Sequence, residues 1–216
     1  MNGQIQYGVA HTVTSGATVA GDRAEPDLLR RLARFRHEVK TLGNPATRAD
    51  LQRLVDMARE LHLADHTISD EMVEIRASFE ALDLADQIAR GGLPAVVSLA
   101  DLPEGERCHF ATPVRFGRRR SDQFGHLELT SGWLRFHGAL DLSVVWTEIS
   151  SVQRLGRDIV VSLADSTRVL RFCCHAVGEA ARGAVVATYL ANAARAREAN
   201  AAQPADAAVT VEPWAR

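Results

Sequence analysis

The 216-residue chain contains a single lysine, Lys40, among its 25 basic residues. A phosphate-binding loop of the GxxxxGK[ST] type and a lysine that forms a Schiff base in a strand-end pocket are therefore not expected. The sequence also lacks HExxH, CxxC, GxSxG and GxGxxG. The most common metal, redox, nucleophile-elbow and dinucleotide signatures are thus missing. We expect a protein that is not an enzyme and that uses no cofactor.

Cysteine is scarce as well. The three cysteines are an odd number, and Cys173 and Cys174 are adjacent, too close for an ordinary disulfide with each other. This pattern favours a reducing cytoplasm. The N-terminus lacks the basic and apolar regions of a signal peptide, and no uncharged apolar run approaches the roughly 20 residues of a bilayer span. These features predict a soluble cytoplasmic protein with no transmembrane segment.

Residues 26–92 have the spacing of amphipathic helices. A first stripe with apolar side chains three and four positions apart consists of Leu28, Leu32, Phe35, Val39 and Leu42. A second helix is expected over about 47–63. A third is expected from the N-cap residue Ser69 to the glycine pair that begins at Gly91. We expect the three stripes to pack together; the alternative is a helix-partner surface.

The period changes to alternation after residue 105. Seven short strands are predicted over about 108–115, 125–130, 133–136, 142–147, 149–155, 158–163 and 167–173, followed by one helix over about 176–198. Because no helix separates the strands, they predict a bent antiparallel sheet or partly open barrel with the helix at one end. Trp133 and Trp146 are expected to fill its interior.

The strand order resembles the plan of the pleckstrin-homology (PH) superfold. The text GHLELTSGWLRFHG, from Gly125 to Gly138, is similar to the second and third strands of bacterial PH-like or GRAM-like domains. VVWTEISSVQR, over 144–154, resembles the fourth strand running into the fifth. The resemblance covers about 93–197. It implies a module that binds lipids, peptides or protein partners, and it brings no catalytic residues with it.

Four arginines within six residues are the sharpest chemical feature: Arg115, Arg118, Arg119 and Arg120. They fall between the first two expected strands, in the loop that grips inositol phosphates in many PH domains. Guanidinium groups suit phosphate oxygens, and residues 105–216 carry net charge +3 against −5 for residues 1–104. Four arginines supply only about 4 kcal/mol at an anionic surface, a Kd of about 1 mM, so a pocket or avidity must add to them. The alternative is a solvated loop.

Cys108, His109, Cys173, Cys174 and His175 resemble a metal-ligand set in composition. Adjacent residues of a strand point to opposite faces, so only one of Cys173 and Cys174 can face a given site. We therefore predict no metal site. Nucleic acid is the least favoured partner, because the whole chain is acidic and no aromatic residues are interleaved with the arginines.

Together these observations predict an α+β protein with four parts. These are a flexible arm (1–25), an α-helical region of about three helices (26–92), a seven-stranded antiparallel PH-like barrel with a C-terminal helix (93–198), and a disordered tail (199–216). We expect a non-enzymatic binding or scaffolding protein of bacterial type, cytoplasmic or peripheral at the inner membrane face. Its ligand would be a partner protein or an anionic lipid headgroup, with the helices mediating self-association or holding a second partner. The alternative is an enzyme with a pocket at the junction of helices and barrel.

Overall fold

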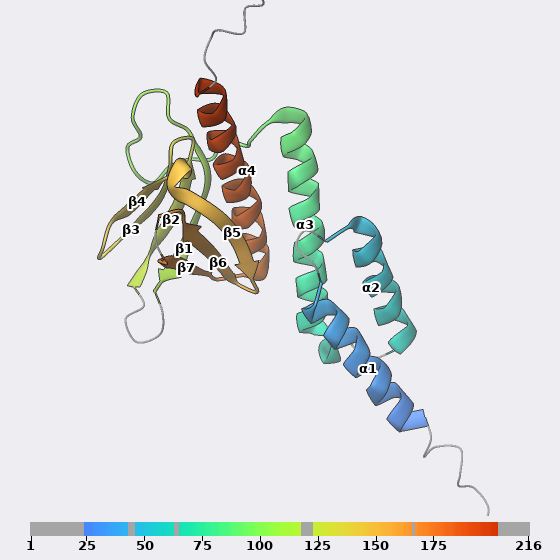
Figure 1. Ribbon diagram of the computed structural model, residues 1–216. Coiled ribbons are helices and arrows are strands. Elements are labelled where there is room, and N and C mark those ends of the chain that lie inside the picture. The colour runs from blue at the N-terminus through green and yellow to red at the C-terminus, as the bar shows by residue number, and fades with distance from the viewer. Residues whose placement is uncertain (1–23, 43–45, 63–64, 118–122, 166, 203–216) are drawn as a thin grey trace, which may run out of the picture.

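The computed structural model describes residues 24–42, 46–62, 65–117, 123–165 and 167–202 (Figure 1). The arm predicted for 1–25 lies outside these residues up to residue 23, and the predicted tail lies outside them from residue 203. The last helix ends at Ala201, so it continues into the segment that the sequence assigned to the tail. The proposed division into domains stays a prediction.

Helices come first and strands follow. The helical part consists of α1 (Ala24–Lys40), α2 (Arg48–Leu61), a 3-10 turn η1 (Asp65–Thr67) and α3 (Ser69–Gly91). The sheet part consists of β1 (Cys108–Phe116), β2 (Gln123–Thr130), β3 (Trp133–Gly138), β4 (Leu142–Val145), the 3-10 turn η3 (Trp146–Glu148), β5 (Ile149–Leu155), β6 (Asp158–Leu163), β7 (Val169–Cys174) and α4 (Val177–Ala201). The α+β class and the seven strands with a terminal helix are confirmed.

The apolar stripe of α1 forms the centre of the helical part. Phe35 is fully buried, with Leu32 and Val39 buried on either side of it. These residues pack against Leu51 and Leu54 of α2, which are also fully buried. Because the stripes meet inside this chain, the intramolecular packing expected from the sequence is confirmed.

All seven strands form one antiparallel sheet in the order β4-β3-β2-β1-β7-β6-β5. Within the described strands, β4 and β5 are the two edges and do not pair with each other, so the word barrel applies only loosely. This strand order with a terminal helix is the plan that the PH resemblance implies. The narrower expectation of a GRAM-like domain of bacterial type stays a prediction.

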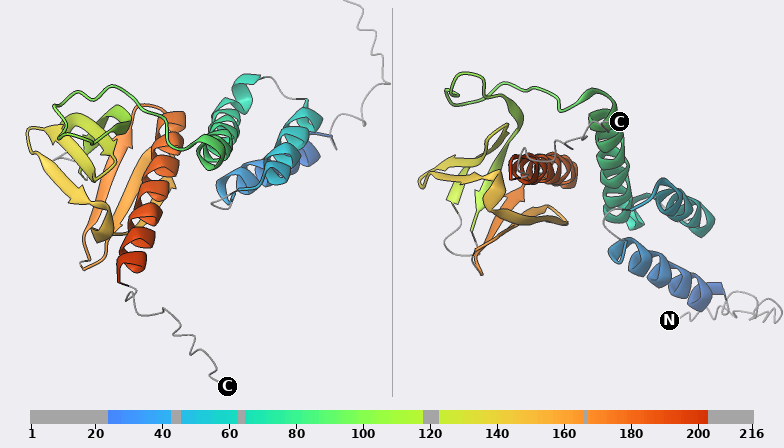
Figure 2. Two further views of the ribbon diagram at one scale, coloured as in Figure 1. Left: turned by 90° about the horizontal axis from the view of Figure 1, so that it is seen from above. Right: turned by 45° about the horizontal axis from the view of Figure 1, so that its top comes forward.

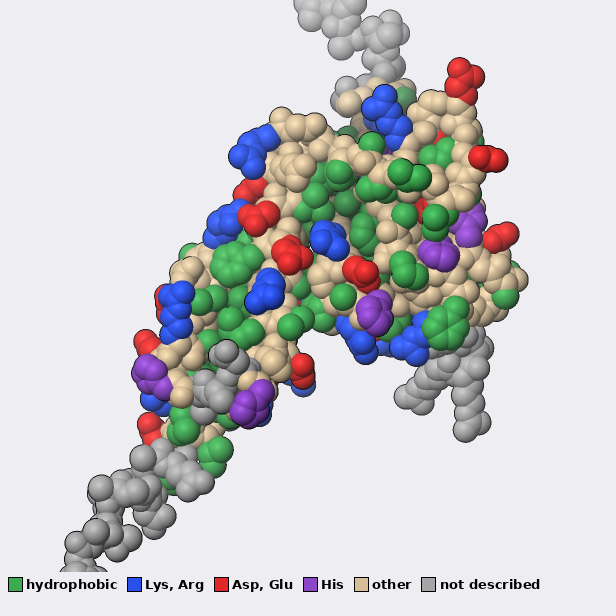
Figure 3. All heavy atoms as spheres, turned by 180° about the vertical axis from the view of Figure 1, so that it is seen from behind, with side chains coloured by type: hydrophobic (Ala, Val, Ile, Leu, Met, Phe, Trp, Pro, Cys, Tyr) green, Lys and Arg blue, Asp and Glu red, His purple; other side chains and the backbone are tan. Residues whose placement is uncertain are grey.

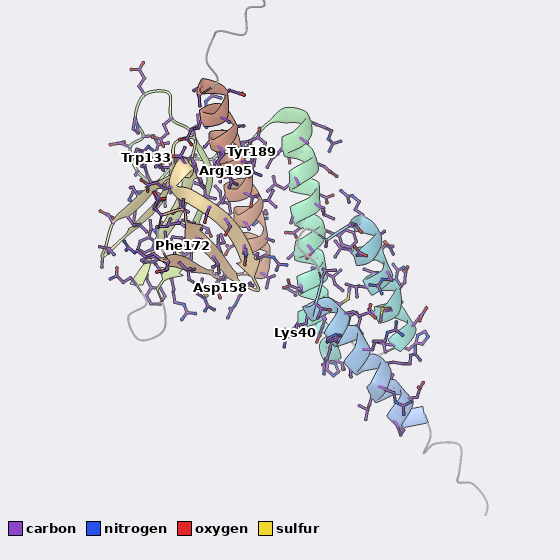
Figure 4. The ribbon with its side chains drawn as sticks, in the orientation of Figure 1. Lys40, Trp133, Asp158, Phe172, Tyr189 and Arg195 are labelled. Carbon is purple, nitrogen blue, oxygen red and sulfur yellow. The ribbon has the colours of Figure 1, made fainter. Side chains whose placement is uncertain are left out.

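The terminal helix α4 lies between the sheet and α3, as both views of Figure 2 show. Its sheet side approaches so closely that a Cβ on Gly183 would lie 2.6 Å from Cδ1 of Ile159. On the opposite side Ile88 of α3 joins the main core, and Arg182 lies 3.8 Å from Glu80 of α3. Arg195 of α4 also donates a 3.0 Å hydrogen bond to the carbonyl of Ser150 on β5 (Figure 4). Two covered sides explain why α4 buries side chains on more than one face.

Two glycines in the segment from Gly125 to Gly138 leave room for one aromatic ring. Gly125 of β2 lies opposite Gly138 of β3. A Cβ on Gly125 would lie 2.6 Å from Cζ of the fully buried Phe136 ring, and one on Gly138 would lie 2.9 Å from the same atom. Phe136 can therefore reach the core only because both positions lack a side chain.

Two local expectations were wrong. Trp133 does not fill the interior: it is 37% exposed, and the guanidinium carbon of Arg135 lies 6.0 Å from its ring centroid. Trp146 does fill it: the side chain is 2% exposed, and its buried indole N–H donates a 2.8 Å hydrogen bond to the carbonyl of Thr130. Ser69 is the first residue of α3 rather than its N-cap, and its hydroxyl donates to the carbonyl of His66.

Candidate functional site

The first predicted site residue, Arg115, lies near the end of β1 on the outer face of the sheet. Its neighbour Val114 is buried in the core, whereas Arg115 is exposed. Directly opposite Arg115 in register lie Phe124 of β2 and Cys173 of β7. The guanidinium Nη2 is 3.5 Å from Sγ of Cys173, and Phe124 is 77% exposed. Arginine, aromatic ring and thiol therefore form one row across three strands.

A second arginine lies beside this row. Arg171 of β7 donates a 2.8 Å hydrogen bond from Nε to the buried carboxylate of Asp158 on β6, and its Nη2 contacts the same oxygen. A buried carboxylate needs such a partner, because water no longer solvates it. This pair balances one positive charge with one negative charge. Arg115 is a second guanidinium group on the same face.

The inner face at this end of the sheet is filled. Phe116, Phe136 and Phe172 form a cluster in which the ring centroids of Phe116 lie 5.0 Å from Phe136 and 5.1 Å from Phe172. Phe172, labelled in Figure 4, is fully buried within the sheet. A ligand that approaches the β1–β2 loop therefore meets the outer face and the loop rather than an opening into the core.

The other three predicted site residues, Arg118, Arg119 and Arg120, lie outside the described residues. The chain reaches them through Gly117, whose φ of 119° favours glycine and whose N–H donates to the carbonyl of Arg171. It returns at Gln123, the first residue of β2. The described strands thus place both ends of the arginine loop next to the row of Arg115 and Phe124.

A buried glutamate that was not among the candidate residues from the sequence lies on the same outer face. Glu128 of β2 is fully buried, and it is covered by the segment 93–107, which we call the strap. Its carboxylate accepts a 2.6 Å hydrogen bond from the N–H of Leu99 and a 3.0 Å hydrogen bond from the hydroxyl of Ser98. The signal in the sequence is a lone carboxylate at an outward position of an alternating strand. Which segment covers it could not be deduced.

The strap is also fastened near its two ends. At its start, His109 of β1 lies 2.7 Å from the carbonyl of Pro94 through Nδ1 and 3.0 Å from the hydroxyl of Ser131 through Nε2. At its end, Glu106 accepts hydrogen bonds from Thr130 and from Arg135. His109, a considered metal ligand, therefore has both ring nitrogens engaged in fixing loops.

Two histidines occupy the outer face between Glu128 and Phe124. His126 of β2 lies directly opposite His137 of β3. Nε2 of His137 is 3.4 Å from Oε2 of Glu128 but not aligned for a hydrogen bond, and Nδ1 is 3.8 Å from Oδ1 of Asp141. His137 therefore lies between two carboxylates, the buried one of Glu128 and the exposed one of Asp141.

The cysteines do not form a common site. Cys174 lies opposite Val114, six positions along β1 from Cys108. Among the described residues, no group of three or more His, Cys, Asp or Glu side chains is arranged to hold a metal ion. Burial raises the pKa of the Cys174 thiol to about 12, and burial likewise raises the pKa of Cys108. Cys173 is only partly buried.

Two open hollows lie away from the arginine loop. One of about 450 Å³ lies between the β2–β3 turn, η3 and the end of α4, with Trp146 and Arg197 among its lining residues. The other, of about 440 Å³, lies between α1 and α2 near Glu38 and Arg53. Neither is lined by α3, whose Ile88 packs into the core of the sheet part and whose Glu74 pairs with Arg154 of β5.

Among the described helices, none has the length and apolar character needed to cross a bilayer. This applies also to α4, the longest of them, which carries five charged side chains: Glu179, Arg182, Arg195, Arg197 and Glu198.

No family model and no curated protein matches this chain. Among solved structures, the C-terminal domain of an unknown protein from Leishmania infantum matches at 18% identity and TM-score 0.34, over 40% of this chain and 86% of that chain. The linker-DH/PH domains of p115-RhoGEF match at 12% identity and TM-score 0.36, over 81% of this chain and 56% of that chain. The DH/PH domains of p115-RhoGEF match at 10% identity and TM-score 0.35, over 77% of this chain and 54% of that chain. With TM-scores this low, none of these likenesses supports a statement about function.

Proposed function

We propose that this chain is a non-enzymatic binding module whose sheet part attaches to anionic membrane lipids. Arg115 and the loop arginines Arg118, Arg119 and Arg120 would bind the phosphates. The observation that carries the proposal is the position of Arg115: it is exposed on the outer face at the root of the arginine loop, while phenylalanine rings fill the interior behind it. A filled sheet with an exposed arginine at the root of the arginine loop suits surface binding better than catalysis, which needs a pocket that encloses a substrate.

The charge distribution supports an anionic ligand. The half of the chain that contains the sheet carries net charge +3, whereas the half that contains the helices carries −5. An anionic surface would therefore orient the protein with its sheet part toward the surface. At roughly 1 kcal/mol per arginine, the four loop arginines give about 4 kcal/mol, so additional contacts must contribute to useful affinity.

Vesicle flotation tests the proposal. We expect the wild-type protein to float with phosphatidylserine-containing vesicles and not with phosphatidylcholine vesicles, and to remain bound at physiological salt. The variant Arg118→Ala/Arg119→Ala/Arg120→Ala should bind about a hundredfold more weakly, because each charge is worth about fivefold. The matched control, Arg30→Ala/Arg34→Ala/Arg59→Ala, removes the same charge from exposed positions of α1 and α2. Equal binding of both variants would refute the loop as the lipid site.

A partner protein is the second candidate, and the strap favours it. Val97 and Leu99 are 88% and 66% exposed, although the strap beneath them is held by Glu128. Asp101 and Glu104 on the same segment are exposed, so the strap suits a basic protein segment better than an anionic lipid. If the protein binds no vesicle, the strap is the next surface to test, and the variant Val97→Ser/Leu99→Ser removes its exposed apolar side chains.

A further inference from the structure

The outer face of β1, β2 and β3 beside the arginine loop combines an exposed aromatic ring with one arginine and two histidines. Phe124 and His126 lie two positions apart on β2 and so point to the same side of the sheet. Arg115 lies opposite Phe124, and His137 lies opposite His126. Figure 3, which views the molecule from behind, shows hydrophobic, arginine and histidine side chains gathered near the grey segment at the lower right. We call Arg115, Phe124, His126 and His137 the outer-face cluster.

Phe124 is unusual for a strand residue of a folded domain. Leu127 and Leu129, on the opposite face of β2, are fully buried in the core, whereas the phenyl ring of Phe124 is 77% exposed. Exposed aromatic rings next to guanidinium groups are typical of surfaces that enter the headgroup region of a bilayer, where the ring leaves water and the cation meets phosphate. Phe124 can therefore supply the apolar contact that the arginines alone lack.

Imidazole is the side chain whose charge most readily responds to acidification, so two neighbouring histidines on one face suggest a surface that depends on pH. From β2, the buried Glu128 lies 3.4 Å from His137; from the β3–β4 connection, Asp141 lies 3.8 Å from it. A positive charge on His137 would lie close to both carboxylates, which would offset part of it.

Among the described residues, two arginines and one further carboxylate lie near the pair. On β3, Arg135 lies on the same face as His137 and pairs with Glu106 of the strap. On β1, Arg115 lies one outward position along from Pro113, the residue opposite His126. His126 is exposed, and no carboxylate occupies the β1 or β3 position opposite it. A proton on His126 therefore adds positive charge to the cluster.

We propose that the outer-face cluster is the surface by which this protein lies on an anionic bilayer, and that acidification strengthens the attachment by charging His126 and His137. The inference rests on the proposed function and assigns to it residues outside the arginine loop. The bilayer, rather than a soluble phosphate, is the partner that fits, because only a bilayer offers Phe124 an apolar region beside the phosphates.

The expected magnitudes follow from the same charges. Each added charge near an anionic surface is worth about fivefold in affinity. Because Glu128 and Asp141 offset part of the charge on His137, binding should rise about fivefold to twentyfold between about pH 7.5 and pH 5.5. Loss of the phenyl ring in Phe124→Ser should weaken binding about tenfold at both values.

Vesicle flotation of the full chain at both pH values tests the inference with three variants. His126→Gln/His137→Gln should bind like wild type at pH about 7.5 and lose most of the gain at pH about 5.5. Phe124→Ser should bind more weakly at both. His37→Gln/His66→Gln, the control, removes two exposed histidines from the helical part and should keep the full gain.

The outcomes separate this inference from the proposed function. If binding does not depend on pH, or if Phe124→Ser binds like wild type, while the triple arginine variant still abolishes binding, the inference is wrong and the proposed function stands. If the gain in acid occurs equally on phosphatidylcholine vesicles, or survives in His126→Gln/His137→Gln, the inference is also wrong. If wild type binds no vesicle at either pH, both proposals fall, and a protein partner is the remaining candidate.

Discussion

Replacing Gly125 by alanine tests the packing that holds β2 and β3 together. A Cβ at this position would overlap the carbonyl oxygen of His137 and would lie 2.6 Å from Cζ of Phe136. The carbonyl belongs to the paired strand and the ring is fully buried, so neither can move without opening the β2–β3 ladder. Overpacking of this kind costs about 3 kcal/mol, at the upper end of the usual range. For a chain of this size the midpoint of thermal unfolding should fall by about 6–12 °C.

Thermal unfolding followed by circular dichroism, with urea titration as a second measurement, provides the assay. Gly91→Ala is the matched control, because nothing lies within 4 Å of a Cβ at that position and alanine favours the last turn of α3. It should leave the midpoint unchanged or raise it slightly. A Gly125→Ala protein that unfolds within about 2 °C of wild type would refute the steric reasoning, since that shift corresponds to less than about 1 kcal/mol.

Two further predictions concern chemistry at single residues. Cys173 should react with iodoacetamide first, and Cys174 should react slowly even at about pH 9. Burial raises the pKa of Cys174 to about 12, and only the thiolate reacts. Mass spectrometry of the alkylated native chain measures the two rates, and equal rates would contradict the burial of Cys174. Glu128→Gln should speed hydrogen exchange at the Leu99 amide about fivefold, since a neutral acceptor binds an N–H about 1 kcal/mol less strongly than a carboxylate; an unchanged rate would show that Glu128 does not hold the strap.

Much of the fold could be predicted because short-range periodicity follows burial directly. The stripe centred on Phe35 and the alternation around Leu127 and Leu129 each have one buried side, so their spacing identifies helix and strand. Trp133 could not be placed in the same way. Its large apolar ring favoured the interior, but its position in β3 places it on the side of Arg135, opposite the buried Leu134 and Phe136.

The site was predicted less completely, because its parts come from distant segments. The arginine loop is visible in the sequence, but its relation to Phe124 depends on the β1–β2 register, and the cover over Glu128 depends on a hydrogen bond from a residue 29 positions away. The wide buried surface of α4 depends on distant segments as well. Its second side is covered by α3, and an alanine-rich helix reads alike whether one or two sides are buried.

The packing of α3 on α4 also holds the helical part in a defined position relative to the sheet part. Ile75 of α3 belongs to the core of the helical part, and Ile88 of the same helix belongs to the core of the sheet part. An ion pair between Glu74 of α3 and Arg154 of β5 adds a further contact along this length. The helix therefore acts as a rigid spacer rather than a tether. Anything held by α1 and α2 would be presented at a constant distance and angle from whatever the outer face of the sheet binds.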